Sequence, residues 1–160
     1  MGNIIDHLIT DRTSADVYRI DNLRKKWYDG TITTTEKAEW FGNLKGAYNA
    51  SDLNRVGEAM GYISARLAKS GYGRVLNLKT DWQMSDEITI ENTNYYLESL
   101  RLLKKWFFVW QTTPEAPEKL SGLNYKEANN IEKILIDINE LITKMQQNYV
   151  YSGEVFCGEV

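Results

Sequence analysis

The segment from Tyr125 to Asn148 carries the longest regular hydrophobic pattern in the chain and constrains the fold most strongly. Its apolar residues recur at three- and four-residue spacing, which places them on one face of an α-helix: Ile131, Ile134, Leu135, Ile138, Leu141, Ile142, Met145 and Tyr149. Polar residues fall on the opposite face: Glu132, Lys133, Glu140, Lys144 and Gln147. The pattern predicts an amphipathic helix about 35 Å long.

A second apolar stripe begins after Ser51 and ends before Gly71, where a glycine is typical of a helix C-terminus. It contains Leu53, Val56, Met60, Ile63 and Leu67. Gly57 and Gly61 lie on a neighbouring face of this predicted helix, although each glycine costs about 1 kcal/mol of helix propensity relative to alanine. We therefore expect another helix backbone to approach closely there; the alternative is that glycine is merely tolerated at exposed positions.

Three further helices are predicted from start signals and spacing. One follows the capping residues 13–16 and carries Val17, Ile20, Leu23 and Trp27. A short one follows a capping box at Thr33 and Glu36. The third runs from about residue 89 to about residue 111, with apolar residues on two faces, so that it is buried on most sides or covered by a partner chain.

The segments between the predicted helices lack helical periodicity. Residues 74–78 suit a short strand or an extended loop, and residues 112–122, which hold both prolines, suit a loop. The sequence thus predicts an all-α bundle of about five helices, formed by residues 1–150 as a single domain, which is a usual size for one core.

An eight-residue pattern occurs at the start of two predicted helices. Residues 49–56 and 124–131 share the form Asn-x-x-acid-apolar-Asn-x-β-branched. We expect Asn49 and Asn124 to cap the free backbone amides, and we expect Asn54 and Asn129, inside the first turns, to bond a neighbouring loop.

The C-terminal residues 151–160 contain a second repetition, YSGEV followed by FCGEV. Aromatic and β-branched residues around glycines suit an extended segment that adds to another chain. A frayed terminus is the alternative.

Composition argues against several classes of function. The net charge of −3 and pI near 5.3 give no basic footprint for nucleic acid. The most apolar segment, 106–110, is far shorter than the roughly 20 residues that span a bilayer, so no membrane insertion is expected. The first ten residues lack the features of a signal peptide, so we expect synthesis in the cytoplasm. Cys157 is the only cysteine, which excludes an intrachain disulfide.

No group of residues in the sequence requires one particular chemistry. A nucleophilic triad would have to combine His7, the single histidine, with residues far along the chain, and a satisfied or solvent-facing His7 is the better interpretation. The 22 acidic residues are compatible with glycoside hydrolysis, but the sequence favours no pair of them. There is no glycine-rich phosphate loop. We predict no catalytic residue, no metal site and no cofactor.

Aromatic residues are the remaining signal, with five Trp and ten Tyr in the chain. Such residues are enriched in protein interfaces and in sugar-binding surfaces. Tyr72 and Trp82 lie in predicted irregular segments, where binding sites concentrate, and are candidate surface aromatics.

Four segments of the chain resemble a module found in tail and baseplate structural proteins of phages and prophages of Gram-positive bacteria: DRTSADV (11–17), LKGAYNASDLNRV (44–56), LNYKEANNIEKIL (123–135) and YSGE (151–154). The resemblance implies a non-catalytic component of a virion or tail-like particle, with other tail proteins as partners, and it carries over no catalytic site. Tail parts assemble as symmetric oligomers. The candidate assembly interface is Trp106, Trp110, Tyr151, Val155 and Phe156.

Other classes of function remain as alternatives. The first is a carbohydrate-binding module that recognises the bacterial cell surface through exposed Tyr and Trp. The second is a wall-degrading enzyme that uses a carboxylate pair, and the third is a cytoplasmic regulator that binds host proteins.

Deletion of residues 151–160 is expected to leave the fold intact and to abolish assembly, because the predicted helices end before this segment. Circular dichroism would measure the fold, and co-purification with particles would measure assembly. Full incorporation of the truncated chain would contradict the expectation.

Overall fold

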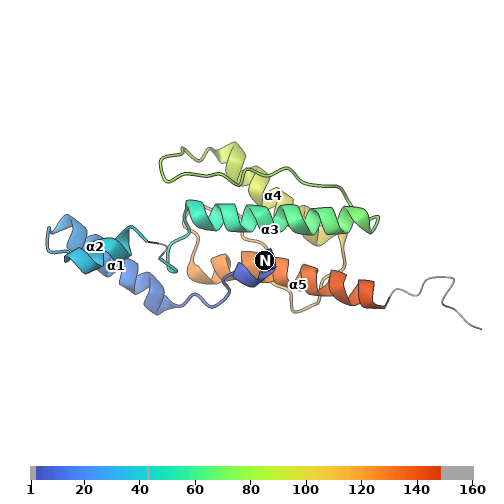
Figure 1. The fold of residues 1–160 in the computed structure, drawn as a ribbon, viewed down its shortest axis with the longest axis horizontal. Helices are drawn as coiled ribbons and strands as arrows, with labels where there is room; N and C mark the ends of the chain where they lie inside the picture. The colour runs from blue at the N-terminus through green and yellow to red at the C-terminus, as the bar shows by residue number, and fades with distance from the viewer. Residues whose placement is uncertain (1–2, 43, 149–160) are drawn as a thin grey trace, which may run out of the picture.

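The computed structural model describes residues 3–42 and 44–148, and over these residues it contains five α-helices, one short 3-10 helix and no strand. The predicted all-α class is confirmed (Figure 1). The elements in chain order are η1 Ile4–His7, α1 Ser14–Tyr28, α2 Thr34–Trp40, α3 Ala50–Lys69, α4 Ile90–Trp106 and α5 Tyr125–Gln147.

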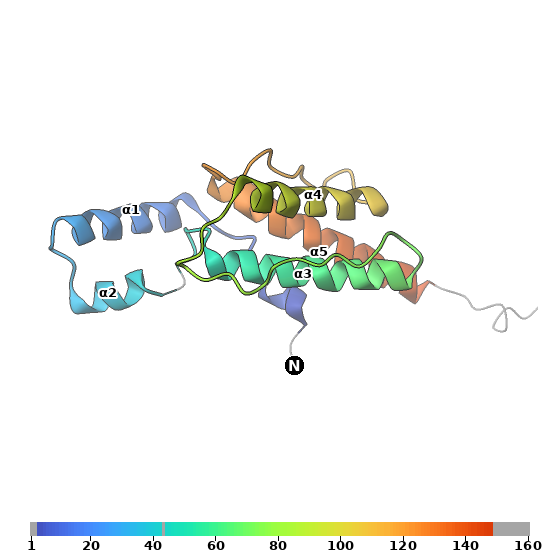
Figure 2. The ribbon, with the colours of Figure 1, turned by 90° about the horizontal axis from the view of Figure 1, so that it is seen from above.

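The three long helices α3, α4 and α5 pack together as a body in which all three run in the same direction (Figures 1 and 2). Each connection between them must therefore return along the full length of the body. Residues 70–89 return from the end of α3 to the start of α4, and residues 107–124 return from the end of α4 to the start of α5. Connections of this length without regular structure are uncommon in compact domains.

The core of the body lies where the apolar faces of these helices meet. The stripe predicted for α3 is confirmed, because all five of its residues are buried, and so are Ile131, Ile134, Leu135, Ile138 and Ile142 of α5. From α4 the core takes Tyr96, Leu97, Leu100 and Leu103, and η1 adds Ile5. Burial of these side chains away from water is the main favourable contribution to folding.

Side chains of the long helices bond the backbone of the first return segment. Ser64 Oγ of α3 accepts a hydrogen bond from Leu76 N at 3.0 Å. The Asn54 side chain pairs with the backbone of Trp82, accepting from its N–H at 2.7 Å and donating to its C=O at 2.9 Å. An extended segment outside a sheet leaves its peptide N–H and C=O groups without backbone partners. These side-chain hydrogen bonds satisfy some of those groups.

The second return segment is held in the same way by α4 and α5. Asp137, a fully buried carboxylate of α5, accepts a hydrogen bond from Thr113 Oγ1 at 2.8 Å and pairs with Lys133. Arg101 Nη2 donates to Pro117 O at 2.7 Å, and α4 also supplies a lysine to the carbonyl of Pro114.

The helix predicted for residues 89–111 ends earlier than expected. α4 stops at Trp106, and Phe107 is extended, with φ −135° and ψ 157°. The ring of Phe107 packs edge-on against Tyr72 with centroids 5.1 Å apart. This contact with the first return segment, and not the apolar periodicity, decides where the helix ends. Residues 74–78 form the extended loop and not the strand.

The polar face predicted for α5 is wrong at Glu132, which is fully buried because two arginines pair with it. The close approach predicted at the α3 glycines is also partly wrong. An added Cβ at Gly57 would lie 3.2 Å from Lys79 O, so the neighbour is a return segment and not a helix. No atom lies within 4 Å of the corresponding position at Gly61, as the alternative predicted.

Charge at the helix ends suits the parallel arrangement. All five α-helices begin with a capping box, from Thr13, Thr33, Asn49, Thr89 and Asn124. The last turns of the three long helices carry basic residues: Arg66, Lys69, Lys104, Lys105 and Lys144. Parallel dipoles gather partial negative charge at one end of the body, and these cations offset it.

α1 and α2 form a helical hairpin that projects from one end of the body (Figure 1). Residues 8–13 lead into it and the segment after α2 leads back to α3. Gly46 lies against the start of α1, since an added Cβ would overlap the backbone carbonyl of Asp16. Of the helices in residues 3–42 and 44–148, none is long and apolar enough to cross a membrane.

Two substitutions in α3 test the packing at its glycines. Gly61→Ala is expected to raise the free energy of unfolding by roughly 0.5–1 kcal/mol, because alanine is the better helix former and the added Cβ meets no neighbour. Gly57→Leu is expected to lower it by about 1–3 kcal/mol, because the side chain must displace the return segment. Urea unfolding measures both, and equal effects would contradict the assigned packing.

Candidate functional site

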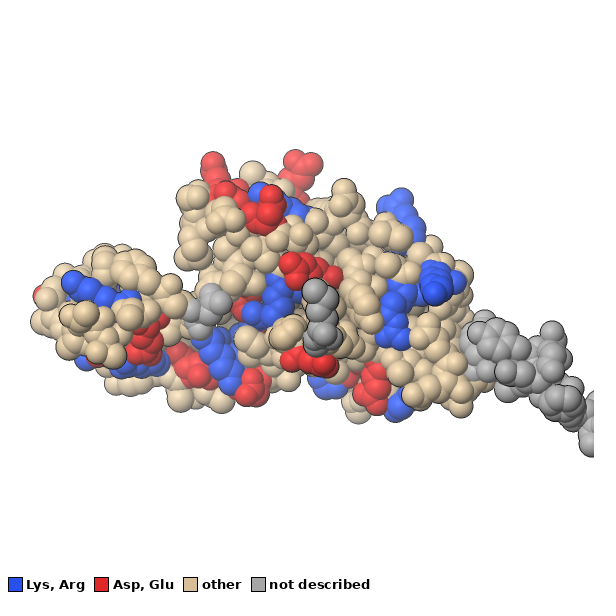
Figure 3. Space-filling view, in the orientation of Figure 1, with Lys and Arg blue, Asp and Glu red and all other residues tan. Residues whose placement is uncertain are grey.

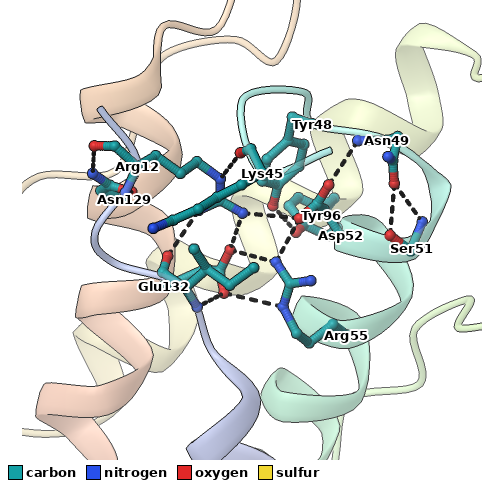
Figure 4. Close-up of polar contacts among 11 residues, drawn as sticks. Arg12, Lys45, Tyr48, Asn49, Ser51, Asp52, Arg55, Tyr96, Asn129 and Glu132 are labelled. Atoms are coloured by element: carbon teal, nitrogen blue, oxygen red, sulfur yellow. Dashed lines mark hydrogen bonds and ion pairs between the residues drawn. The ribbon is translucent and has the colours of Figure 1, made fainter. Parts of the chain in front are cut away.

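Four charged side chains meet where the hairpin joins the body (Figure 4). Arg12 Nη2 lies 2.8 Å from Asp52 Oδ1 and 2.7 Å from Glu132 Oε1. Arg55 Nη2 contacts the same two oxygens, at 2.5 Å and 2.8 Å. Arg12 is 3% exposed and Glu132 is 0% exposed, so the two cations and two anions form a neutral cluster largely inside the protein.

Backbone groups of both linkers complete the cluster. Glu132 Oε2 accepts a hydrogen bond from Ile9 N at 2.6 Å, and Arg12 Nη1 donates to Ile9 O at 2.7 Å. Arg12 Nε donates to Lys45 O at 3.1 Å, on the segment that leads back from the hairpin. One guanidinium therefore holds the incoming and the outgoing linker to the same point of the body.

The electrostatics of the cluster are those of a closed network. Burial alone would lower the pKa of Arg55, but its hydrogen bonds to Glu132 and Asp52 raise it above the ordinary value. Beside the cluster, burial raises the pKa of Tyr48 well above its usual range, and its hydroxyl lies 2.6 Å from that of Tyr96. The raised pKa values keep Arg55 charged and Tyr48 neutral near neutral pH. With its ion pairs and hydrogen bonds closed on one another, the cluster acts as a structural joint.

The duplicated asparagine pattern works as the sequence predicted. Asn49 and Asn124 cap α3 and α5. Asn129 accepts a hydrogen bond from Arg12 N at 3.1 Å and donates to Arg12 O at 2.9 Å, as Asn54 does at Trp82. Each second asparagine of the repeat thus fixes one peptide unit of a neighbouring loop.

The hairpin itself is held together by ion pairs and a small aromatic group. Arg19 forms a two-bond pair with Glu39, at 2.9 Å and 2.6 Å. The hydrogen bond from Lys26, with that from the Thr33 backbone, lowers the pKa of Glu36 to about 2. Trp27, at the end of α1, packs on Trp40 and Phe41 with ring centroids 6.5 Å and 5.4 Å apart.

Few hairpin side chains are removed from water. Leu23 is the only residue of α1 and α2 that is buried. Tyr18, Tyr28 and Phe41 are largely exposed. A groove of about 390 Å³ lies between the hairpin and the body, and its apolar lining comes from Ile20, Trp40, Phe41, Leu44, Ala47 and Met84. The hairpin thus presents aromatic surface and an adjoining apolar groove at one end of the molecule.

The aromatic residues predicted from the sequence are not gathered in one place. The expectation for Trp82 is wrong: it is 8% exposed, in the core, because Asn54 holds its backbone against α3. Tyr72 is exposed, as expected. Trp106 and Trp110 are half-buried; Trp106 packs on Gly73 and Trp110 lies under the ammonium of a lysine of α5.

The remaining predicted positions add no chemistry. His7 is exposed, as the sequence analysis favoured. Tyr151, Val155, Phe156 and Cys157 lie outside the described residues. Within residues 3–42 and 44–148, no three His, Cys, Asp or Glu side chains are placed to hold a metal ion.

Sequence reasoning missed the exposed aromatics of the hairpin and the role of Arg12. Tyr18 and Tyr28 lie off the apolar stripe of α1, and that position was a usable signal of exposure. Arg12 gave no signal, because a lone arginine before a helix is ordinarily solvated.

Comparisons of the chain with protein-family models, with curated proteins and with solved structures find no match.

Two substitutions in α5 test the buried cluster. Glu132→Ala is expected to lower the free energy of unfolding by about 3–5 kcal/mol, because it leaves Arg12 and Arg55 without one of their two anions. Glu140→Ala removes an exposed pair with Lys144 on the same helix and is expected to change it by less than about 0.5 kcal/mol. Urea unfolding compares the two variants, and a small effect at Glu132 would contradict the assigned joint.

Proposed function

We propose that this protein is a non-catalytic structural or adaptor component of a phage tail, baseplate or related particle and acts through protein–protein assembly. The observation that supports the proposal most directly is the projecting hairpin, which exposes Tyr18, Tyr28 and Phe41. Phe41 also lines an apolar groove between the hairpin and the body. Aromatic surface of this kind is typical of the cores of protein interfaces.

The hairpin needs a partner on energetic grounds. α1 has 15 residues and α2 has seven, and helices this short are marginal in water unless packing stabilises them. Leu23 alone is fully buried within them, and Val17, Ile20 and Trp40 are half-buried, so part of the apolar surface of the pair is still in contact with water. A partner that covers this surface would remove its apolar groups from water, and that burial would favour binding.

The buried charge cluster supports a mechanical role for the hairpin. Arg12 and its hydrogen bonds fix both linkers to α3 and α5, so the hairpin is presented from a defined point of the body (Figure 4). Presenting a surface in a fixed orientation reduces the entropy lost on binding. The setting in a phage tail comes from the resemblance of the four sequence segments, with other tail proteins and further copies of this chain as partners.

The decisive experiment locates the chain on particles from the strain that encodes it. Immunogold electron microscopy with antibody to the chain is expected to place gold at a fixed position on the tail. The double variant Tyr18→Ser with Tyr28→Ser is expected to stay folded, because both side chains are exposed, and to lose incorporation. Tyr62→Ser, a half-exposed aromatic of α3, is the matched control and should incorporate normally. Unlabelled intact particles in the wild type would refute the proposal.

A further inference from the structure

We propose that copies of this chain bind one another head to tail, through a basic-rimmed apolar patch at one end of the body and an acidic-rimmed apolar patch at the other. The inference deepens the proposed assembly function, since it names a second copy as partner and identifies the two surfaces that meet.

The first surface, the basic patch, lies where α3 and α4 end. Its exposed apolar side chains are Phe108, which is 88% exposed, on the segment after α4, and Tyr72 and Val75 on the segment after α3. The two segments that form it lie side by side, because the Tyr72 ring contacts Phe107 and the Trp106 ring covers Gly73. Residues of this size in contact with water are candidates for an interface when they are grouped.

Cations surround this apolar part. Lys69, Arg74 and Lys105 are all exposed, and none of them forms an ion pair with another described residue. Figure 3 shows Lys and Arg gathered at this end of the molecule. Their position follows from the fold, because parallel helices bring their C-terminal turns, and the cations that stabilise them, to one end.

The second surface, the acidic patch, lies in the segment that leads into α4. Its exposed apolar side chains are Ile88, Ile90, which is 80% exposed, and Met84, which is 81% exposed and also lines the groove beside the hairpin. Glu87 and Glu91 are exposed, and neither pairs with a cation among the described residues.

Two further anions and one cation belong to the same surface. Asp81 and Asp86 both bind Lys79, at 3.3 Å and 3.1 Å, so this small group carries a net negative charge even with its lysine counted. Figure 3 shows several Asp and Glu side chains on the part of the molecule around the start of α4.

The two patches cannot meet within one chain. Ile90 begins α4 and Phe108 follows its end, and a helix of 17 residues separates them by about 25 Å. Contact between them therefore requires two copies. Such a contact is heterologous, and repeated contacts of this kind give a closed ring or an open filament.

Charge also selects the orientation of the two copies. Contact between two basic patches, or between two acidic patches, would place like charges together, which disfavours that orientation. Basic against acidic places opposite charges around two apolar centres. A second copy is the favoured occupant because each patch finds its complement, in charge and in apolar character, on the same chain.

The test is sedimentation velocity of the full chain with charge-reversed variants. The wild type is expected to self-associate, and to do so more weakly when the salt rises from about 50 mM to about 500 mM. Arg74→Glu with Lys105→Glu, or Glu87→Lys with Glu91→Lys, should each weaken association about tenfold or more. Mixing the two double variants should restore it, because the reversed patches are again complementary. Lys25→Glu with Lys37→Glu on the hairpin is the matched control and should associate like the wild type.

Three results would overturn the inference. One is a wild type that stays monomeric up to about 1 mM. Another is association that either double variant retains, or that mixing the two double variants fails to restore, when circular dichroism shows that both variants are folded. The third is association that disappears only when residues 149–160 are removed, which would assign the contact to that segment. If the purified chain is monomeric but immunogold still labels the particles, head-to-tail binding is refuted and the tail function is not. If the chain shows salt-sensitive association but the particles carry no gold, the tail function is refuted and head-to-tail binding is not.

Discussion

The parallel orientation of α3, α4 and α5 is the constraint on which the rest of this structure depends. Antiparallel neighbours need only short turns, but parallel helices need connections as long as the helices themselves. Residues 70–89 and 107–124 supply those connections, and their backbone groups have no helix or sheet to pair with. Polar side chains of the helices bind them instead, among them the half-buried Asn54 and the buried Ser64 and Asp137. The polar residues that bind the return segments are therefore a consequence of the topology.

The same topology accounts for the electrostatic pattern of the surface. Because the three dipoles add, cations gather where the long helices end, and the acidic segment before α4 lies at the opposite end. The buried cluster of Arg12, Asp52, Arg55 and Glu132 then fixes the hairpin close to the end at which α3 begins. A body with distinct ends and a fixed projection is suited to directional assembly.

Much of the fold could be predicted from local sequence signals. The stripes of α3 and α5 identified most of the core, and Thr13, Thr33, Asn49 and Asn124 identified helix starts, because a cap depends on residues within one turn. The repeated asparagines even indicated side-chain bonds to loops. The predictions that failed concern contacts between residues far apart in the sequence. The end of α4 depends on Tyr72, and the burial of Trp82 depends on Asn54. The exposed aromatics Tyr18 and Tyr28 were missed although their position off the apolar stripe of α1 is a local signal that the sequence carries.

The sequence by itself determined the all-α class, the order of the helices and the faces that pack inward, since periodicity and capping are properties of neighbouring residues. Only the tertiary structure decided that the long helices run parallel, that Glu132 is buried, and that opposite charges lie at opposite ends. Those features depend on which side chains meet across large sequence separations. A carboxylate on the polar side of a helical wheel is ordinarily solvated, and it becomes a core residue here because Arg12, 120 positions away, binds it.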